Sequence, residues 1–154
     1  MGANVVINGS GFTDALGIVP VVKFDGVAAK LMTSSATSLT VTVPAGTKTG
    51  TITVTGGGGT ATSAAAFQFY PAPTLSGISP TTGAPGAAIA LTGTNFQIGA
   101  ARPMVLFNGV AATIVQLTAT KITVAVPAKA ASGHIAITTL GGSATSSGTF
   151  TVQP

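Results

Sequence analysis

The sequence contains no cysteine, no tryptophan and no glutamate among its 154 residues, and only two aspartates and one histidine. Without cysteine the chain has no disulfide, no thiolate metal ligand and no thiol nucleophile. General acid–base catalysis requires several positioned titratable side chains, and this supply is too small for most of that chemistry. We therefore expect no enzyme activity, no catalytic residue, no cofactor and no metal site.

Charged residues are also rare: they make up 5% of the chain, where about 25% is usual in soluble domains. The net charge of +4 comes from six scattered cations, which are Lys23, Lys30, Lys48, Arg102, Lys121 and Lys129. Nucleic-acid binding needs such groups clustered on one face, so we expect no nucleic-acid partner. A weakly charged surface gives little protection against association. This favours a protein that is packed in an assembly or tethered outside a cell.

Long apolar runs are missing as well, since none reaches the roughly 18 residues of a membrane span. The N-terminal residues do not have the basic-then-apolar order of a signal peptide. We expect no membrane span, and a chain that is either a processed or expressed piece or is delivered without a cleaved signal. Hydrophobic residues still make up 45% of the sequence, which is enough to fold around an apolar core.

The chain contains an internal repeat. The stretch from Gly2 to Phe12 matches the stretch from Gly86 to Phe96, which stands 84 residues later. Further blocks then match at an offset of 83 residues: 22–29 with 105–112, 36–44 with 119–127, 50–54 with 133–137, and 67–69 with 150–152. A single-residue indel across the whole repeat indicates the same fold twice.

Each repeat consists of short runs in which apolar residues alternate with Thr, Ser or Ala. These apolar residues are Val5, Ile7, Leu39, Val41, Val43, Ile52 and Val54, then Ile89, Leu91, Ile122, Val124, Val126, Ile135 and Ile137. Alternation with period two places them on one face of a β-strand. Turn signals separate the runs, namely Asn8-Gly9, Asp25-Gly26, Gly56–Gly59, Asn108-Gly109 and Gly141-Gly142. The sequence therefore predicts an all-β chain of two tandem immunoglobulin-like β-sandwiches.

Four motifs of the second repeat resemble the IPT/TIG family of immunoglobulin-like domains. They are the opening from Ser79-Pro80 to Gly86, the strand end from Gly93 to Phe96, the hairpin from Val105 to Gly109, and the Val126-Pro127 step before residues 133–137. The first repeat carries the last three, so the resemblance covers nearly the whole chain. It implies tandem IPT/TIG domains of the E-set type, as in a bacterial or viral surface protein.

The repeat also sets the expected domains: residues 1–70, a proline-rich linker at 71–73, and residues 74–154. Two prolines in the linker predict a stiff, extended connection. The first repeat has no counterpart of residues 73–85, which should form the first strand of the second domain. Either the chain is a piece of a longer array, or a strand from a neighbouring subunit fills the gap. An uncovered strand edge is an aggregation hazard, so we expect something to cover it.

Three titratable side chains have structural interpretations. Asp25 has Asn108 as its counterpart, which predicts a turn residue. Asp14 lies in the loop after Phe12, where calcium binding would need backbone carbonyls for most of its ligands. His134 is expected to face solvent because its counterpart is Thr51.

Three further features of the sequence also have structural interpretations. Gly56–Gly59 is followed by neither Lys-Ser/Thr nor a helix, so it predicts a hairpin tip and no phosphate loop. Asn8-Gly9-Ser10 matches a glycosylation sequon, but we predict a turn there, as also at Thr92-Gly93-Thr94. Lys23 has Leu106 as its counterpart and flanks the core, but no glutamate is available to promote an isopeptide bond.

These observations favour a structural or adhesive module of an extracellular assembly, such as a surface filament, an adhesin array or a virion surface. Its expected partners are other copies of itself or neighbouring Ig-like domains, through stacking and strand complementation. The alternative is a carbohydrate-binding or spacer module beside a secreted glycan-active enzyme, with a cell-surface glycan as partner, since IPT/TIG domains also accompany starch-active enzymes. Sugar binding usually requires exposed aromatic side chains. Tyr70 is the only tyrosine, and most of the phenylalanines recur in register as core positions, which disfavours this alternative. DNA recognition, known from related Rel-type domains, is disfavoured because the loops lack clustered Arg and Lys.

Overall fold

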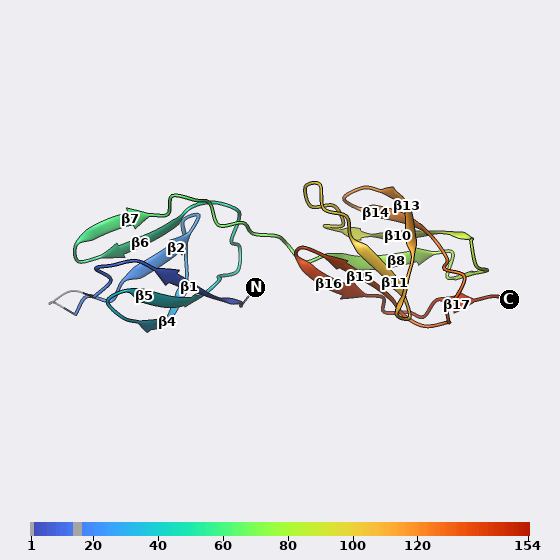
Figure 1. Ribbon diagram of the computed structural model, residues 1–154, viewed down its shortest axis with the longest axis horizontal. Coiled ribbons are helices and arrows are strands. Elements are labelled where there is room, and N and C mark those ends of the chain that lie inside the picture. The colour runs from blue at the N-terminus through green and yellow to red at the C-terminus, as the bar shows by residue number, and fades with distance from the viewer. Residues whose placement is uncertain (1, 14–16) are drawn as a thin grey trace. The chain divides into compact units, whose positions relative to one another are not determined.

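The computed structural model describes residues 2–13 and 17–154. All the secondary-structure elements within these residues are β-strands. The chain divides into two compact units, residues 1–69 and 70–154 (Figure 1). The predicted all-β class is confirmed, and so is the repetition of one fold.

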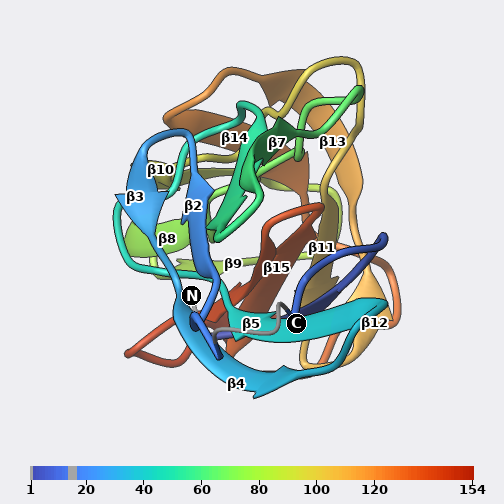
Figure 2. The same cartoon turned by 90° about the vertical axis from the view of Figure 1, so that its left-hand side faces the viewer.

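The first unit is a sandwich of two antiparallel sheets. One sheet has the order β1-β5-β4 and the other the order β3-β2-β6-β7. Its strands are β1 (Asn4–Asn8), β2 (Val21–Phe24), β3 (Val27–Ala28), β4 (Lys30–Ser34), β5 (Ser38–Thr42), β6 (Ile52–Gly56) and β7 (Gly59–Thr62). Figure 2 shows β4 and β5 on one side of this unit and β2, β3 and β7 on the other.

The second unit repeats these strands in the same order and adds three. The repeated strands are β10 (Ala88–Thr94), β11 (Met104–Phe107), β12 (Val110–Ala111), β13 (Thr113–Leu117), β14 (Lys121–Ala125), β15 (Ile135–Thr139) and β16 (Gly142–Thr145). The additional strands are β8 (Thr74–Ser79), β9 (Thr82–Gly83) and β17 (Thr151–Val152). The sheets have the orders β13-β14-β10-β8 and β12-β11-β15-β16, and β9 pairs with β17.

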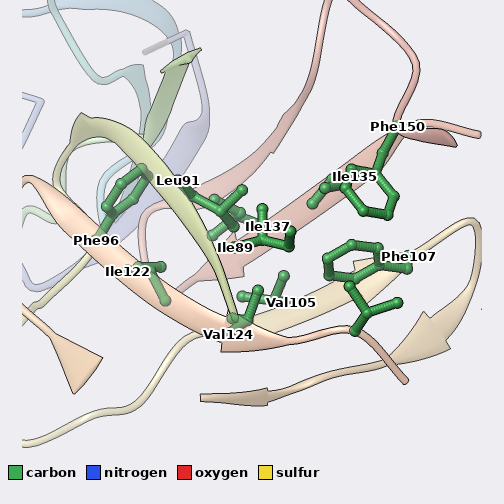
Figure 3. Packing of buried hydrophobic residues seen from close by; sticks show 11 residues of the cluster. Ile89, Leu91, Phe96, Val105, Phe107, Ile122, Val124, Ile135, Ile137 and Phe150 are labelled. Atoms are coloured by element: carbon green, nitrogen blue, oxygen red, sulfur yellow. The ribbon is translucent and has the colours of Figure 1, made fainter. Parts of the chain in front are cut away.

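The alternating residues fill the space between the sheets, as the period-two pattern predicts. Leu39 and Val41 of β5 are fully buried, and so are their counterparts Ile122 and Val124 of β14. Phe107 and Phe150 meet edge to face in the second core, with ring centroids 5.1 Å apart (Figure 3). Edge-to-face geometry adds to the stabilisation that burial of the two rings already provides.

The Asp-Gly and Asn-Gly turns have the backbone that these residues favour. Asp25 has φ 46° and Gly26 φ 82°, while Asn108 has φ 43° and Gly109 φ 89°. Two successive residues with positive φ form a type I′ turn, which matches the twist of a two-residue hairpin. The predicted turn role of Asp25 is thereby confirmed, because β2 and β3 flank it as β11 and β12 flank Asn108.

The glycine three residues before a phenylalanine makes room for the aromatic ring. A Cβ built on Gly9 would stand 2.6 Å from Cζ of Phe12, and one built on Gly93 would stand 2.5 Å from Cζ of Phe96. Distances below about 3 Å do not occur for real Cβ atoms. The phenylalanine ring therefore folds back over the glycine of its own strand. This packing explains why glycine stands three residues before phenylalanine in both repeats.

One turn prediction was wrong. Residues Thr92, Gly93 and Thr94 lie within strand β10 and form no turn, and the register of β10 with β8 shifts between Thr92 and Gly93. The pairing with β8 extends β10 through Thr94, where the hydroxyl of Thr74 lies 2.8 Å from that of Thr94. In the first unit β1 ends at Asn8, the first residue of the sequon.

Candidate functional site: the open face of the first unit

In the second unit a single segment closes both sheets of the sandwich. Strand β8 pairs antiparallel with β10 and contacts β16 of the opposite sheet. The chain then continues into β9, which pairs in parallel with β17. The N–H of Thr151 donates to the carbonyl of Thr81, and the N–H of Gln153 donates to that of Gly83, each at 3.0 Å.

Among the described residues, the first unit has no strand in the place of β8 or β9. Strand β1 pairs with β5 on one side, and no other strand among residues 2–13 and 17–69 pairs with it. The segment after the Gly50–Phe67 bridge corresponds to β17 and likewise forms no strand. Two edges that one segment covers in the second unit are therefore open in the first.

The open edges change the burial of matched core residues. Phe12, Val5, Ile7, Ile52, Val54 and Phe67 are only partly buried and pack around the edge of the first core. Their counterparts Phe96, Ile89, Leu91, Ile135, Ile137 and Phe150 are fully buried. The side chains are the same or similar in size at each pair, so the difference comes from what covers them.

A groove runs along this open face. Its larger hollow, of about 330 Å³, lies between the β1 end and the β6–β7 hairpin, and its lining includes Ile7, Phe12, Ile52, Val54 and Ala61. A second hollow of about 310 Å³ shares Phe12, Val54 and Ala61 with it. In the second unit this place is filled by β8, whose side chains Leu75 and Ile78 pack against the core. The groove thus occupies the place that β8 fills.

The backbone of β1 presents hydrogen-bonding groups to the groove. In an antiparallel strand, successive residues direct their N–H and C=O groups to opposite neighbours. The N–H of Gly9 donates to the carbonyl of Thr37 on the β5 side, so the groups of Val6 and Asn8 point to the open side. Val6 is also 59% exposed. An exposed edge of this kind is a template for another strand.

None of the described residues that line the groove is charged. Its lining residues across both hollows are Ile, Val, Phe, Ala, Pro, Gly, Ser, Thr and Asn. An apolar floor with an uncharged rim favours an uncharged, partly apolar occupant, because a buried unpaired charge is costly. Chemically the face is suited to binding a chain segment through main-chain hydrogen bonds and apolar side chains.

Two of the three titratable residues singled out from the sequence, Asp25 and His134, lie away from the groove. Asp25 packs over Gly50, just ahead of β6, since a Cβ built on Gly50 would stand 2.7 Å from its Oδ1. His134 is exposed, as predicted, and its Nδ1 lies 2.9 Å from the carbonyl oxygen of Ser146. Asp14 lies outside the described residues. The described structure brings neither Asp25 nor His134 to the groove.

The remaining candidates fall on hairpins and strands. Gly57 and Gly58 form the turn between β6 and β7, and Gly59 has φ 118°, which confirms the predicted hairpin tip. Lys23 is an exposed residue of β2, opposite Thr53 and Ala28. Within the described residues no three His, Asp or Glu side chains are grouped to hold a metal, and no helix long and apolar enough to cross a membrane is found.

Sequence reasoning anticipated an uncovered edge but missed the residues that line it. Ile7, Ile52 and Val54 belong to the alternating apolar residues that the sequence places on one face of a strand, and Phe12 recurs in register as Phe96. The sequence does contain a signal, which is the missing counterpart of residues 73–85. The residues that this segment would cover are the first-unit counterparts of those that β8 covers in the second unit.

The comparisons with known proteins agree with this architecture. The family model described as the IPT/TIG domain matches the chain twice, over residues 1–69 and 73–152. No curated protein is significantly similar to the chain.

Solved structures with the same fold include two bacterial binding proteins. An auxiliary nutrient binding protein from Bacteroides thetaiotaomicron VPI-5482 has 26% sequence identity and a TM-score of 0.50, over 54% of this chain and 21% of that one. A surface glycan-binding protein from Prevotella bryantii has 16% identity and a TM-score of 0.50, over 97% of this chain and 37% of that one. The chain therefore spans well under half the length of either protein.

Proposed function

Because the chain belongs to the IPT/TIG domain family, matched over both of its units, we propose that it is a non-catalytic structural module of a surface-exposed or extracellular assembly. Its function is contact between β-modules. The observation that carries this proposal is the open face of the first unit, where core residues such as Phe12 are partly buried while Phe96 is fully buried.

Covering that face is energetically favourable. Burial of apolar surface contributes roughly 25 cal/mol per Å², and the residues concerned already contact a folded core. The weakly charged surface opposes association very little. A module with these properties is suited to a packed array, in which neighbouring modules supply the missing cover.

The proposed role is tested by sedimentation velocity over micromolar to millimolar concentrations of the chain. We expect reversible self-association through the open face. Ala61 is exposed and lines both hollows, so Ala61→Arg places a charged side chain in the groove and weakens the association. Met32→Arg is the matched control, because Met32 is 50% exposed on β4, the edge strand farthest from β1 in the β1-β5-β4 sheet. A chain that stays monomeric throughout, or associates equally with Ala61→Arg, contradicts the proposal.

Nutrient or glycan binding is the second candidate function. It is supported by the 26% identity to the auxiliary nutrient binding protein over one half of the chain. The only tyrosine, Tyr70, is 38% exposed and offers an aromatic face of the kind that sugars stack on. Affinity electrophoresis through gels containing soluble neutral polysaccharides, starch among them, tests this role. Retardation that Tyr70→Ala abolishes and Tyr70→Phe retains supports glycan binding, and unretarded migration in every gel contradicts it.

A further inference from the structure

The groove has a specific complement elsewhere in the same chain. Residues 74–83 fill the equivalent face of the second unit, where β8 bonds to β10 and β9 to β17. Each copy of the chain, however, has two such faces and only one such segment among its described residues. Exchange of β8 between copies would fill one face by opening another, so it cannot complete the first unit.

The register of the missing strand follows from the second unit. Leu91 pairs with Ile78 and Thr92 with Gly77 in the β10–β8 ladder. The counterparts of Leu91 and Thr92 in β1 are Ile7 and Asn8. A strand added to β1 in this register therefore places an apolar side chain opposite Ile7 and a small residue opposite Asn8.

The occupant is restricted at two further positions. A Cβ built on Gly77 would stand 2.6 Å from Oγ1 of Thr92, and the larger Asn8 replaces that threonine in the first unit. A Cβ built on Gly83 would stand 3.3 Å from both Ala87 Cβ and Ile89 Cδ1. The counterparts of Ala87 and Ile89 are Ala3 and Val5, and valine has no Cδ atom, so this position favours a small residue without requiring glycine. The position of Gly77 favours glycine.

We propose that the open face of the first unit binds an extended strand donated by another polypeptide, with the pattern of residues 74–83. The strand is uncharged, has apolar residues at the positions of Leu75 and Ile78, glycine at the position of Gly77, and a small residue at the position of Gly83. It adds antiparallel to β1 through the outward backbone groups of Val6 and Asn8, and its apolar side chains cover Phe12 and Ile7. This inference rests on the proposed structural role and names the partner of its contact surface.

The test uses the full chain and a fluorescein-labelled synthetic peptide with the sequence of residues 73–86. Fluorescence anisotropy should show saturable binding of one peptide per chain. A peptide with Asp in place of the residue matching Ile78 should bind at least about tenfold more weakly, because that side chain packs against the core. A scrambled peptide of the same composition should not bind. Equal binding of the scrambled peptide, or no binding at all, overturns the proposal.

Two variants of the chain locate the site. Ala61→Arg should weaken peptide binding, and Met32→Arg should leave it unchanged. In a third variant, residues 73–85 are duplicated directly ahead of Gly2, so that the first unit receives its own strand. This variant should no longer bind the peptide, and the signals of Phe12 should shift toward a buried environment in NMR spectra. Unchanged peptide binding by the duplicated variant overturns the proposal even if every variant folds.

The outcomes separate this inference from the proposed function. If the chain self-associates through the open face but does not bind the peptide, the structural role stands and the donated strand is wrong. If the chain binds the peptide but does not self-associate, the donated strand stands and contact between copies is wrong.

Discussion

Phe24 and Phe67 meet edge to face in the first unit, with ring centroids 4.9 Å apart and an interplanar angle of 79°. Phe107 and Phe150 make the same contact in the second unit at 5.1 Å and 90°. Phe67 is nevertheless only partly buried, whereas Phe150 is fully buried. Both units thus keep the aromatic contact, but only in the second unit do further residues cover the outer ring.

Removal of matched rings should cost different amounts of stability. We expect Phe96→Ala to lower the free energy of unfolding of the second unit by about 3–5 kcal/mol, the usual cost of truncating a fully buried phenylalanine. Phe12→Ala should cost the first unit about half as much, since its ring is partly exposed at the groove. Urea unfolding followed by the NMR signals of each unit measures both values. Equal costs would mean that the groove is closed in solution.

The two glycines beneath these rings should also differ. A Cβ at Gly93 would collide with the carbonyl oxygen of Thr74 as well as with Phe96. At Gly9 the three nearest atoms all belong to the ring of Phe12, which borders the open groove. We expect Gly93→Ala to destabilise its unit severely and Gly9→Ala to cost markedly less. Thermal melts of the two single variants test this, and a larger loss for Gly9→Ala contradicts it.

The hairpin at Asp25 tests whether that carboxylate has a role beyond the turn. Asp25→Asn introduces the residue found at Asn108, so stability should change by less than about 0.5 kcal/mol. Gly26→Ala forces an L-residue into a left-handed backbone at φ 82° and should cost about 1–2 kcal/mol. Urea unfolding measures both variants. A large loss with Asp25→Asn would show that the charge itself matters.

His134 should be replaceable by the residue of the other repeat. The change His134→Thr removes the contact between Nδ1 and the Ser146 carbonyl, but the first unit folds with Thr51 at this position. Because the side chain is exposed, we expect the free energy of unfolding to stay within about 0.5 kcal/mol. Chemical denaturation of the variant beside the wild type checks this, and a loss several times larger would assign His134 a structural role.

The sequence was sufficient for the strands, the facing of residues such as Leu39 and Val41, and the hairpin turns at Asp25-Gly26 and Asn108-Gly109, because each of these depends on local spacing. It was not sufficient for the parallel pairing of β9 with β17. The two strands are far apart in the sequence, and each is too short to show an alternating pattern of apolar residues. The strand at Thr92–Thr94 was mistaken for a turn because β8, a distant partner, extends β10. Phe12 looks like Phe96 in sequence, and only the missing neighbour makes it accessible.

The most direct test of the open face is amide hydrogen exchange at matched positions of β1 and β10, measured by NMR on the intact chain at a concentration where sedimentation shows a monomer. Ala90 and Thr92 pair with Ser79 and Gly77 of β8, so their amides should be strongly protected. The amides of Val6 and Asn8 point to the groove and should exchange at rates near those of exposed backbone, while residues bonded to β5 stay protected. Protection of Val6 and Asn8 equal to that of Ala90 and Thr92 in the isolated chain would contradict the account.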